Sequence, residues 1–133
     1  MEIPNNVTTY ELQESIVWID NDGIVYSVPK PGITTNFSKE SSKQDMIRFG
    51  EITGNKKVCL IIESNPHSKP PAKEQRDFIA DQLNSFTKAM AIIITSPVSK
   101  MIANLFFGLK PPKYPAKMFT SVEDAREWVK QYL

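Results

Sequence analysis

The chain is poor in the residues that most often carry chemistry, with one cysteine, one histidine and five glycines among its 133 residues. A single cysteine cannot form an intramolecular disulfide, and the lone histidine, His67, has no second histidine with which to share a metal. The C-terminal half contains neither a nucleophile paired with a base nor a glycine-rich loop for phosphate. We therefore expect a non-enzymatic protein that holds neither a cofactor nor a metal.

The sequence also lacks an excess of one charge and a long apolar run. Sixteen basic and fifteen acidic side chains give a formal net charge of +1, without the cationic surplus that attracts nucleic acid or anionic membranes. No stretch approaches the ~18 apolar residues of a membrane span, and residues 1–6 have neither the basic nor the apolar region of a secretory signal. Cys59 lies within an apolar run, where a buried structural thiol is expected. These features favour a cytoplasmic protein with no nucleic-acid partner and no integral membrane segment.

The N-terminal part predicts an antiparallel hairpin. Ser15–Ile19 and Ile24–Val28 are rich in branched and aromatic residues, which suit strands. The residues between them, Asp20-Asn21-Asp22-Gly23, are typical of a tight turn. Residues 8–12 fit a weaker edge strand, and residues 1–7 are expected to form a flexible N-terminus.

A helix should follow the hairpin. Ser41 and Gln44 have the spacing of a capping box, which marks a helix start. The apolar pattern continues to about Ile52, and Gly54 then supplies a C-terminal stop.

The rest of the chain alternates between strand and helix patterns. Val58–Ile62 is apolar on both alternating faces, which is typical of a central parallel strand covered by helices. The terminal helix begins at Thr120, which forms a capping box with Glu123. The other elements expected here are a helix over 72–86, a strand over 89–95, a helix over 98–107 and a strand over 116–119.

This order predicts a single α/β domain spanning residues 1–133. Its mixed sheet would begin with the antiparallel hairpin and continue with parallel strands, and about four helices would pack on it. A chain of this length buries roughly 65–70% of its unfolded surface, which is enough for one core.

Two polar junctions follow neighbouring expected strands. Ser64 and Asn65 follow the central strand, and Ser96 follows the next one. The carboxyl ends of parallel strands meet at one edge of a sheet, where helix N-termini present free N–H groups. The three side chains would then converge on an anion, a phosphate or a partner's carboxylate. The alternative is that Ser96 only caps its helix, with Pro97 at the first helical position, while Ser64 and Asn65 shape a turn.

The segment 101–109 is apolar around most of a helix. Met101 and Leu105 share one face, and Phe106 and Phe107 extend it to the flanks. One face can pack on the sheet, but an exposed apolar remainder is a liability in a monomer. That remainder is expected to complete the core, to form a subunit interface, or to line a site for a lipid-like ligand or a partner helix.

The order of elements, with Lys56–Glu63 as the central strand, resembles the STAS and SpoIIAA-like group. The resemblance runs from about Thr9 to the end of the chain and rests on order and spacing rather than on a catalytic signature. The closing stretches are similar to small bacterial proteins of that group, most of which are uncharacterised. These stretches are 89–97, 101–110, 114–119 and 121–133.

The resemblance implies a regulatory or protein-interaction domain whose partner is another protein or a second copy. In anti-sigma-factor antagonists of the STAS type, a serine just after the central strand is phosphorylated and switches partner binding. At the matching junction here Ser64 follows Glu63, Asn65 takes the place of the phosphoacceptor and Pro66 that of a glycine. CRAL-TRIO lipid carriers, to which the SpoIIAA-like group is similar in fold, suggest instead a small apolar ligand under a helix, for which Leu105, Phe106 and Phe107 are available.

Overall fold

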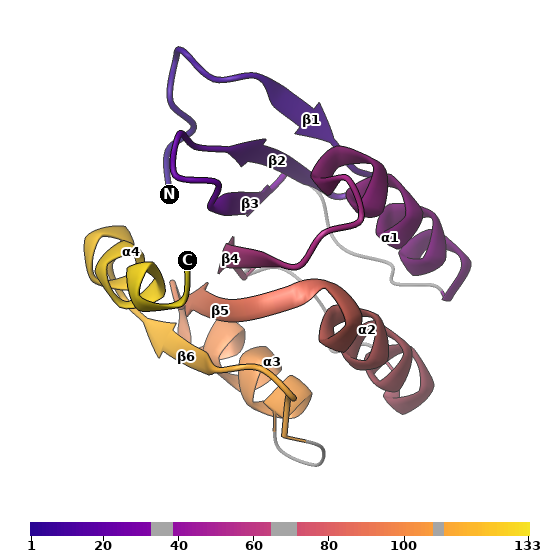
Figure 1. Ribbon diagram of the computed structural model, residues 1–133. Helices are drawn as coiled ribbons and strands as arrows, with labels where there is room; N and C mark the ends of the chain where they lie inside the picture. Colours follow the sequence, from indigo (N-terminus) through magenta and orange to yellow (C-terminus); the bar gives the residue numbers. More distant parts are fainter. Residues whose placement is uncertain (33–38, 65–71, 108–110) are drawn as a thin grey trace.

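Six strands form one mixed sheet whose spatial order follows the chain order, β1-β2-β3-β4-β5-β6 (Figure 1). The computed structural model describes residues 1–32, 39–64, 72–107 and 111–133, apart from the side chains of residues 39, 106 and 107. The strands β1, β2 and β3 are antiparallel, and those from β3 to β6 are parallel. The predicted mixed sheet is confirmed. The strand bounds are β1 (Thr9–Glu11), β2 (Ser15–Ile19), β3 (Val25–Pro29), β4 (Val58–Glu63), β5 (Thr87–Ile93) and β6 (Ala116–Phe119).

The helices cover the two faces of the sheet unequally (Figure 1). Three of them, α1, α2 and α3, connect successive parallel strands and lie on one face. Right-handed crossovers place all three there because the sheet grows in one direction. The last helix, α4, lies on the opposite face. The helix bounds are α1 (Lys39–Thr53), α2 (Lys73–Phe86), α3 (Pro97–Phe107) and α4 (Val122–Val129), and a 3₁₀ turn covers Lys130–Tyr132.

The strand β4 occupies the centre of the parallel region. Leu60 pairs with Met90 of β5, and Ile61 pairs with Ala91. Because successive strand residues point to opposite faces, Leu60 belongs to the core under α1–α3 and Ile61 to the core under α4. The predicted central strand, running in the same direction as the segment that contains Ala91, is therefore confirmed.

Small side chains let α4 approach the sheet closely. Ala125 and Val129 of α4 are fully buried in one core with Ala89 and Ala91 of β5. Cys59 lies in the same core, as predicted, and burial raises the pKa of its thiol above the usual range.

The N-terminal residues 1–7, expected to be flexible, lie against this core. Met1, Ile3 and Val7 pack on it, and the Met1 amino group forms an ion pair with Glu63 at 2.6 Å. The Glu63 side chain thus points to the α4 face. By strand alternation, Ser64 faces the side covered by α1–α3.

The hairpin turn is formed as its sequence predicts. The Asp20 Oδ1 atom accepts the N–H groups of Asp22 at 2.9 Å and of Ile24 at 3.0 Å. Gly23 has a φ of 85°, a left-handed conformation that glycine adopts without strain. Asp20 therefore shapes the turn with its own side chain.

The start of α1 differs from the prediction, while its end agrees. The helix begins at Lys39, so Ser41 lies inside it and the predicted capping box is wrong. The polar run before the apolar pattern offers several N-caps that sequence alone does not separate.

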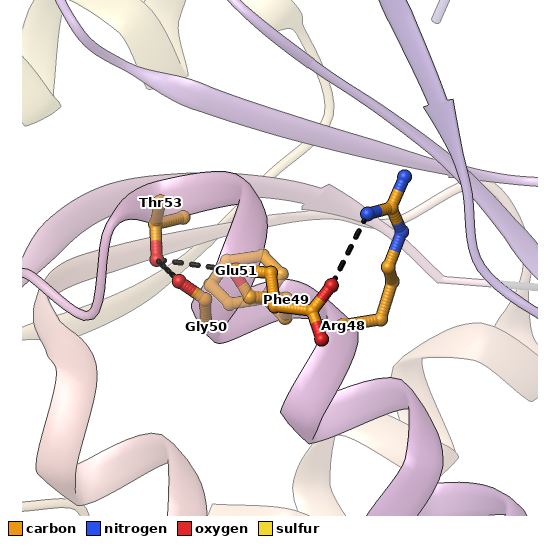
Figure 2. Close-up of polar contacts among 5 residues, drawn as sticks. All are labelled: Arg48, Phe49, Gly50, Glu51 and Thr53. Carbon is orange, nitrogen blue, oxygen red and sulfur yellow. Dashed lines mark hydrogen bonds and ion pairs between the residues drawn. The ribbon is translucent and has the colours of Figure 1, made fainter.

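At the C-terminal end of α1, Gly54 has a φ of 69°, and the Asn55 N–H donates to the Gly50 carbonyl at 2.8 Å. The Thr53 hydroxyl donates to the Phe49 carbonyl at 3.0 Å, which closes the last turn (Figure 2).

Two other boundaries shift by one or two residues. The start of α4 is at Val122, and the Ser121 hydroxyl accepts the Asp124 N–H at 3.1 Å. Ser121, not Thr120, is the N-cap, so the predicted capping box of Thr120 with Glu123 is wrong. The two hydroxyl residues are adjacent, and the backbone conformation decides between them. The strand β5 begins at Thr87, two residues before its predicted start.

Candidate functional site

Ser96 serves the helix that follows it. Its hydroxyl accepts the N–H of Ser99 at 3.1 Å, which caps α3. The buried Ser99 hydroxyl in turn accepts the N–H groups of Thr95 and Ser96, each at 3.0 Å. This reciprocal pair satisfies backbone donors that the helix start would otherwise leave free.

Ser64 lies at the same carboxyl edge of the sheet, directly after β4. Its N–H donates to the Ile93 carbonyl of β5 at 3.3 Å, and its side chain lines two cavities under the helices. Ser96 lines neither cavity. Asn65 and His67 lie outside the described residues, so the convergence of Ser64, Asn65 and Ser96 on an anion stays a prediction.

The helix α3 has a buried face and an exposed apolar face. Ile102 and Ala103 are buried, whereas Val98, Met101 and Leu105 are exposed, Met101 at 48%. The spacing of these three residues places them on one side of the helix. The side chains of Phe106 and Phe107 lie outside the described part of the structure.

The first cavity lies between α2, α3 and the sheet and has a volume of about 190 Å³. Its walls come from Ile79 and Leu83 of α2, Ile102 and Ala103 of α3, and Met90 of β5. Apolar residues make up most of this lining.

The second cavity lies between α1, α2 and the strands β3 and β4, with a volume of about 260 Å³. Its apolar wall includes Phe49 of α1 and Phe86 of α2, whose ring centroids are 4.9 Å apart. These rings hold the two helices together at one end. Serines and acidic residues make the lining of this cavity more polar than that of the first.

The two cavities adjoin beneath α2. Both are lined by Ile62, Ser64, Ile79, Leu83 and Ile102. Together they form one site between the helical layer and the sheet, which we call the helix-side cavity. Ser64, predicted from its place after the central strand, lies where the two parts meet.

Uncharged hydroxyls line the second part of the helix-side cavity. Ser27 of β3, Ser42 of α1 and Ser64 all contribute to it. Ser42 is only 6% exposed, and no described residue forms a hydrogen bond with its hydroxyl. A serine hydroxyl that borders a cavity and has no partner in the described protein is available to hydrogen-bond a ligand.

Asp45 is the acidic group of α1 at this part of the cavity. Its Oδ1 atom accepts the Gln13 N–H at 3.0 Å. Burial raises the pKa of the Asp45 carboxyl, and the Gln13 hydrogen bond and the charge of Lys30 oppose that shift only in part. Lys30 forms an ion pair with Glu11 at 3.6 Å and does not line the cavity.

Tyr114 contributes a phenol to the first part of the cavity. It is 8% exposed, and burial raises its pKa to about 12. No described residue forms a hydrogen bond with its hydroxyl. The nearby Asn84, by contrast, uses its Oδ1 atom to accept the Lys113 N–H at 3.0 Å.

A chain of three polar side chains joins the hairpin to α4 on the other face. The Tyr26 hydroxyl donates to Asp20 Oδ2 at 2.7 Å and accepts the Arg126 Nε–H at 3.0 Å. Burial raises the pKa of Tyr26 to about 12, while the Arg126 hydrogen bond opposes the shift and the Asp20 bond adds to it. Trp18 stacks on the Tyr26 ring with a centroid distance of 5.2 Å. Because Asp20, Tyr26 and Arg126 are hydrogen-bonded to one another, we interpret them as a structural link between the hairpin and α4.

Sequence reasoning missed Ser42, Asp45 and Tyr114 as cavity residues. The first two are polar residues on the same side of α1 as the buried Phe49, and Tyr114 lies in a proline-containing loop before β6. Nothing in the local pattern separates them from solvated residues. Within the described ranges no group of three or more histidine, cysteine or acidic residues is placed to bind a metal.

The fold and the cavity define a mixed α/β domain with an apolar site between one face of its sheet and three helices. Residues 17–133 match the model of the family described as Domain of unknown function (DUF7793), and the chain belongs to this family. Neither the curated proteins nor the solved structures contain a significant match. None of the helices in the described ranges has the length and apolar character needed to cross a membrane.

Proposed function

We propose that this domain is a non-enzymatic binding protein that holds a small apolar molecule in the helix-side cavity. The observation that carries the proposal is the wall shared by the two parts, in which Ile62, Ile79, Leu83 and Ile102 surround Ser64. Ligand sites in proteins are mostly apolar and contain a few polar groups that orient the ligand. The helix-side cavity has this composition.

The volumes limit the size of the ligand. The parts measure about 190 Å³ and about 260 Å³, each below the ~300–1,000 Å³ of typical drug-sized sites. An apolar cavity of about 150 Å³ is large enough for benzene. One part therefore accommodates a single small ring, and a longer molecule would occupy both parts beneath α2.

Toluene is the simplest probe because it has no polar group. We expect it to shift the backbone amide resonances of Ile62, Ser64 and Ile102 saturably in a ¹⁵N-labelled protein. The variant Ala103→Leu should weaken that binding at least about tenfold, because the added side chain fills the first part of the cavity.

Ala72→Leu is the matched control, since it adds the same atoms at an exposed position before α2. It should leave the toluene affinity unchanged. Urea unfolding of both variants checks that the fold is kept. An absence of saturable shifts in the parent protein, or an equal affinity in Ala103→Leu, would contradict the proposal.

A second candidate function is protein interaction through α3, as the STAS-type resemblance implies. Three of the large apolar side chains that are exposed in the described residues, Val98, Met101 and Leu105, lie together on this helix. Such patches mark interaction sites. A second copy is the partner to test first, because a formal charge of +1 opposes association only weakly.

For this candidate we expect a concentration-dependent dimer by analytical ultracentrifugation. Replacing Met101 and Leu105 with serine should raise the dimer dissociation constant at least about tenfold, because it removes apolar contact area. Ile47→Ser is the control, since Ile47 is exposed on α1, away from the patch. A parent protein that stays monomeric, or a dimer unaffected by the double replacement, would rule out self-association through α3.

We also propose that the domain acts in the cytoplasm and is related to the STAS and SpoIIAA-like group. A buried cysteine without a disulfide supports the first proposal. The order of the sheet, with an antiparallel hairpin before parallel strands, supports the second.

A further inference from the structure

We propose that the helix-side cavity selects ligands whose polar group is an uncharged hydrogen-bonding group, such as the hydroxyl of an aliphatic alcohol, and rejects carboxylates. This inference rests on the proposed function and specifies the chemistry of its ligand. It assigns the polar group to the second part of the cavity, beside Ser42.

The hydroxyls of the lining provide the first argument. Ser42 is more than nine-tenths buried, and its hydroxyl, like those of Ser27 and Ser64, has no hydrogen-bond partner among the described residues. A serine hydroxyl both donates and accepts, so it can pair with an alcohol in either direction. A ligand alcohol at this position would gain a hydrogen bond to Ser42 within a mostly apolar lining.

The charges of the lining provide the second argument. Asp45 places a carboxyl group at the second part, whereas the Glu63 side chain points to the α4 face, and the described lining residues include no lysine, arginine or histidine. Lys30, whose charge lowers the pKa of Asp45, is paired with Glu11 at 3.6 Å and does not line the cavity. A ligand carboxylate would therefore enter a partly desolvated site next to like charge and without a cation to compensate it.

The shape of the cavity provides the third argument. Ser27, Ser42 and Asp45 line only the second part, whereas Met90, Ile92 and Ala103 line only the first part, under α3. An unbranched chain whose hydroxyl lies at Ser42 can extend beneath α2, past Ser64, into the first part. A polar head group in the second part and an apolar tail in the first part thus match the lining of the site.

The test compares 1-octanol with octanoate at pH 8, where octanoate is fully ionised, and follows the amide resonances of Ile62 and Ser64. The alcohol should bind at least about tenfold more tightly than the carboxylate, because the described lining residues include no cation to compensate a buried anion. Toluene, which has no polar head group, serves as the reference ligand.

Two variants assign this selectivity to residues. Ser42→Ala should weaken octanol binding about threefold to tenfold and leave toluene binding unchanged, because only the alcohol loses a hydrogen bond. Asp45→Asn keeps an oxygen that accepts the Gln13 N–H and should narrow the gap between octanol and octanoate. Ser85→Ala, at an exposed position of α2, is the matched serine control.

The outcomes separate the two proposals. If toluene binds but octanoate binds as tightly as octanol, the head-group inference is overturned and the apolar site stands. The same holds if Ser42→Ala lowers the affinities for toluene and octanol equally. If none of the three probes binds, both the inference and the proposed function fail.

Discussion

Replacing Ile61 with alanine is expected to lower the free energy of unfolding by about 2–5 kcal/mol. Ile61 is 0% exposed at the centre of β4, where it pairs with Ala91 and packs in the core under α4. The substitution removes three carbons from a site whose neighbours are held by strands on both sides, so the surrounding residues cannot collapse into the space. The loss is a large fraction of the ~5–15 kcal/mol that stabilises a typical domain.

Ile47→Ala is the matched control because it removes the same atoms from a side chain that is 57% exposed on α1. Its effect should stay within about 0.5 kcal/mol. Urea unfolding followed by circular dichroism measures both variants, and the midpoint should fall for Ile61→Ala with an unchanged slope. Similar losses in the two variants would mean that β4 is not the centre of the core.

Raising the pH from 10 to 12 is expected to destabilise the fold by about 2 kcal/mol for each of two buried tyrosines. Burial raises the pKa of Tyr26 and of Tyr114 from 10.0 to about 12. Above pH 10 the unfolded chain loses these phenolic protons while the folded chain keeps them. Because the unfolded state then binds fewer protons, stability falls as the pH rises through this window. The contribution of the two protonated phenols to stability is fully present below their unfolded pKa of 10.0 and is lost as the pH rises through about 12.

Tyr114→Phe isolates one of these contributions. The Tyr114 hydroxyl has no hydrogen-bond partner among the described residues, so its removal leaves no donor or acceptor unpaired. In urea unfolding at pH 9 and at pH 12, the variant should lose about 2 kcal/mol less than the parent protein between the two conditions. A pH dependence identical to that of the parent would show that the phenol ionises equally in both states.

Local patterns in the sequence were enough to predict most elements of the fold. The run Val58–Ile62 is apolar on both faces and proved to be the central strand, and the turn at Asp20 forms as its residues indicate. The burial of Ala125 and Val129 follows from their spacing on a helix. These features depend on periods of two and 3.6 residues, which a single segment contains.

The helix starts show where local patterns fail. Thr120 and Ser121 are both good N-caps, as are Ser41 and the residues before it, and only the backbone conformation selects one. For the site, the position of Ser64 after a strand was readable in the sequence. The roles of Ser42, Asp45 and Tyr114 were not, since they depend on how far α1 and α2 stand from the sheet.

The sequence by itself determined the order of strands and helices, the central place of β4 and the burial of Cys59, because each follows from the polarity pattern of a short segment. Only the tertiary structure decided that α1, α2 and α3 share one face and that a cavity remains beneath α2. The reason is that a cavity is a mismatch of volume among side chains that are far apart in the chain. No local pattern records that mismatch.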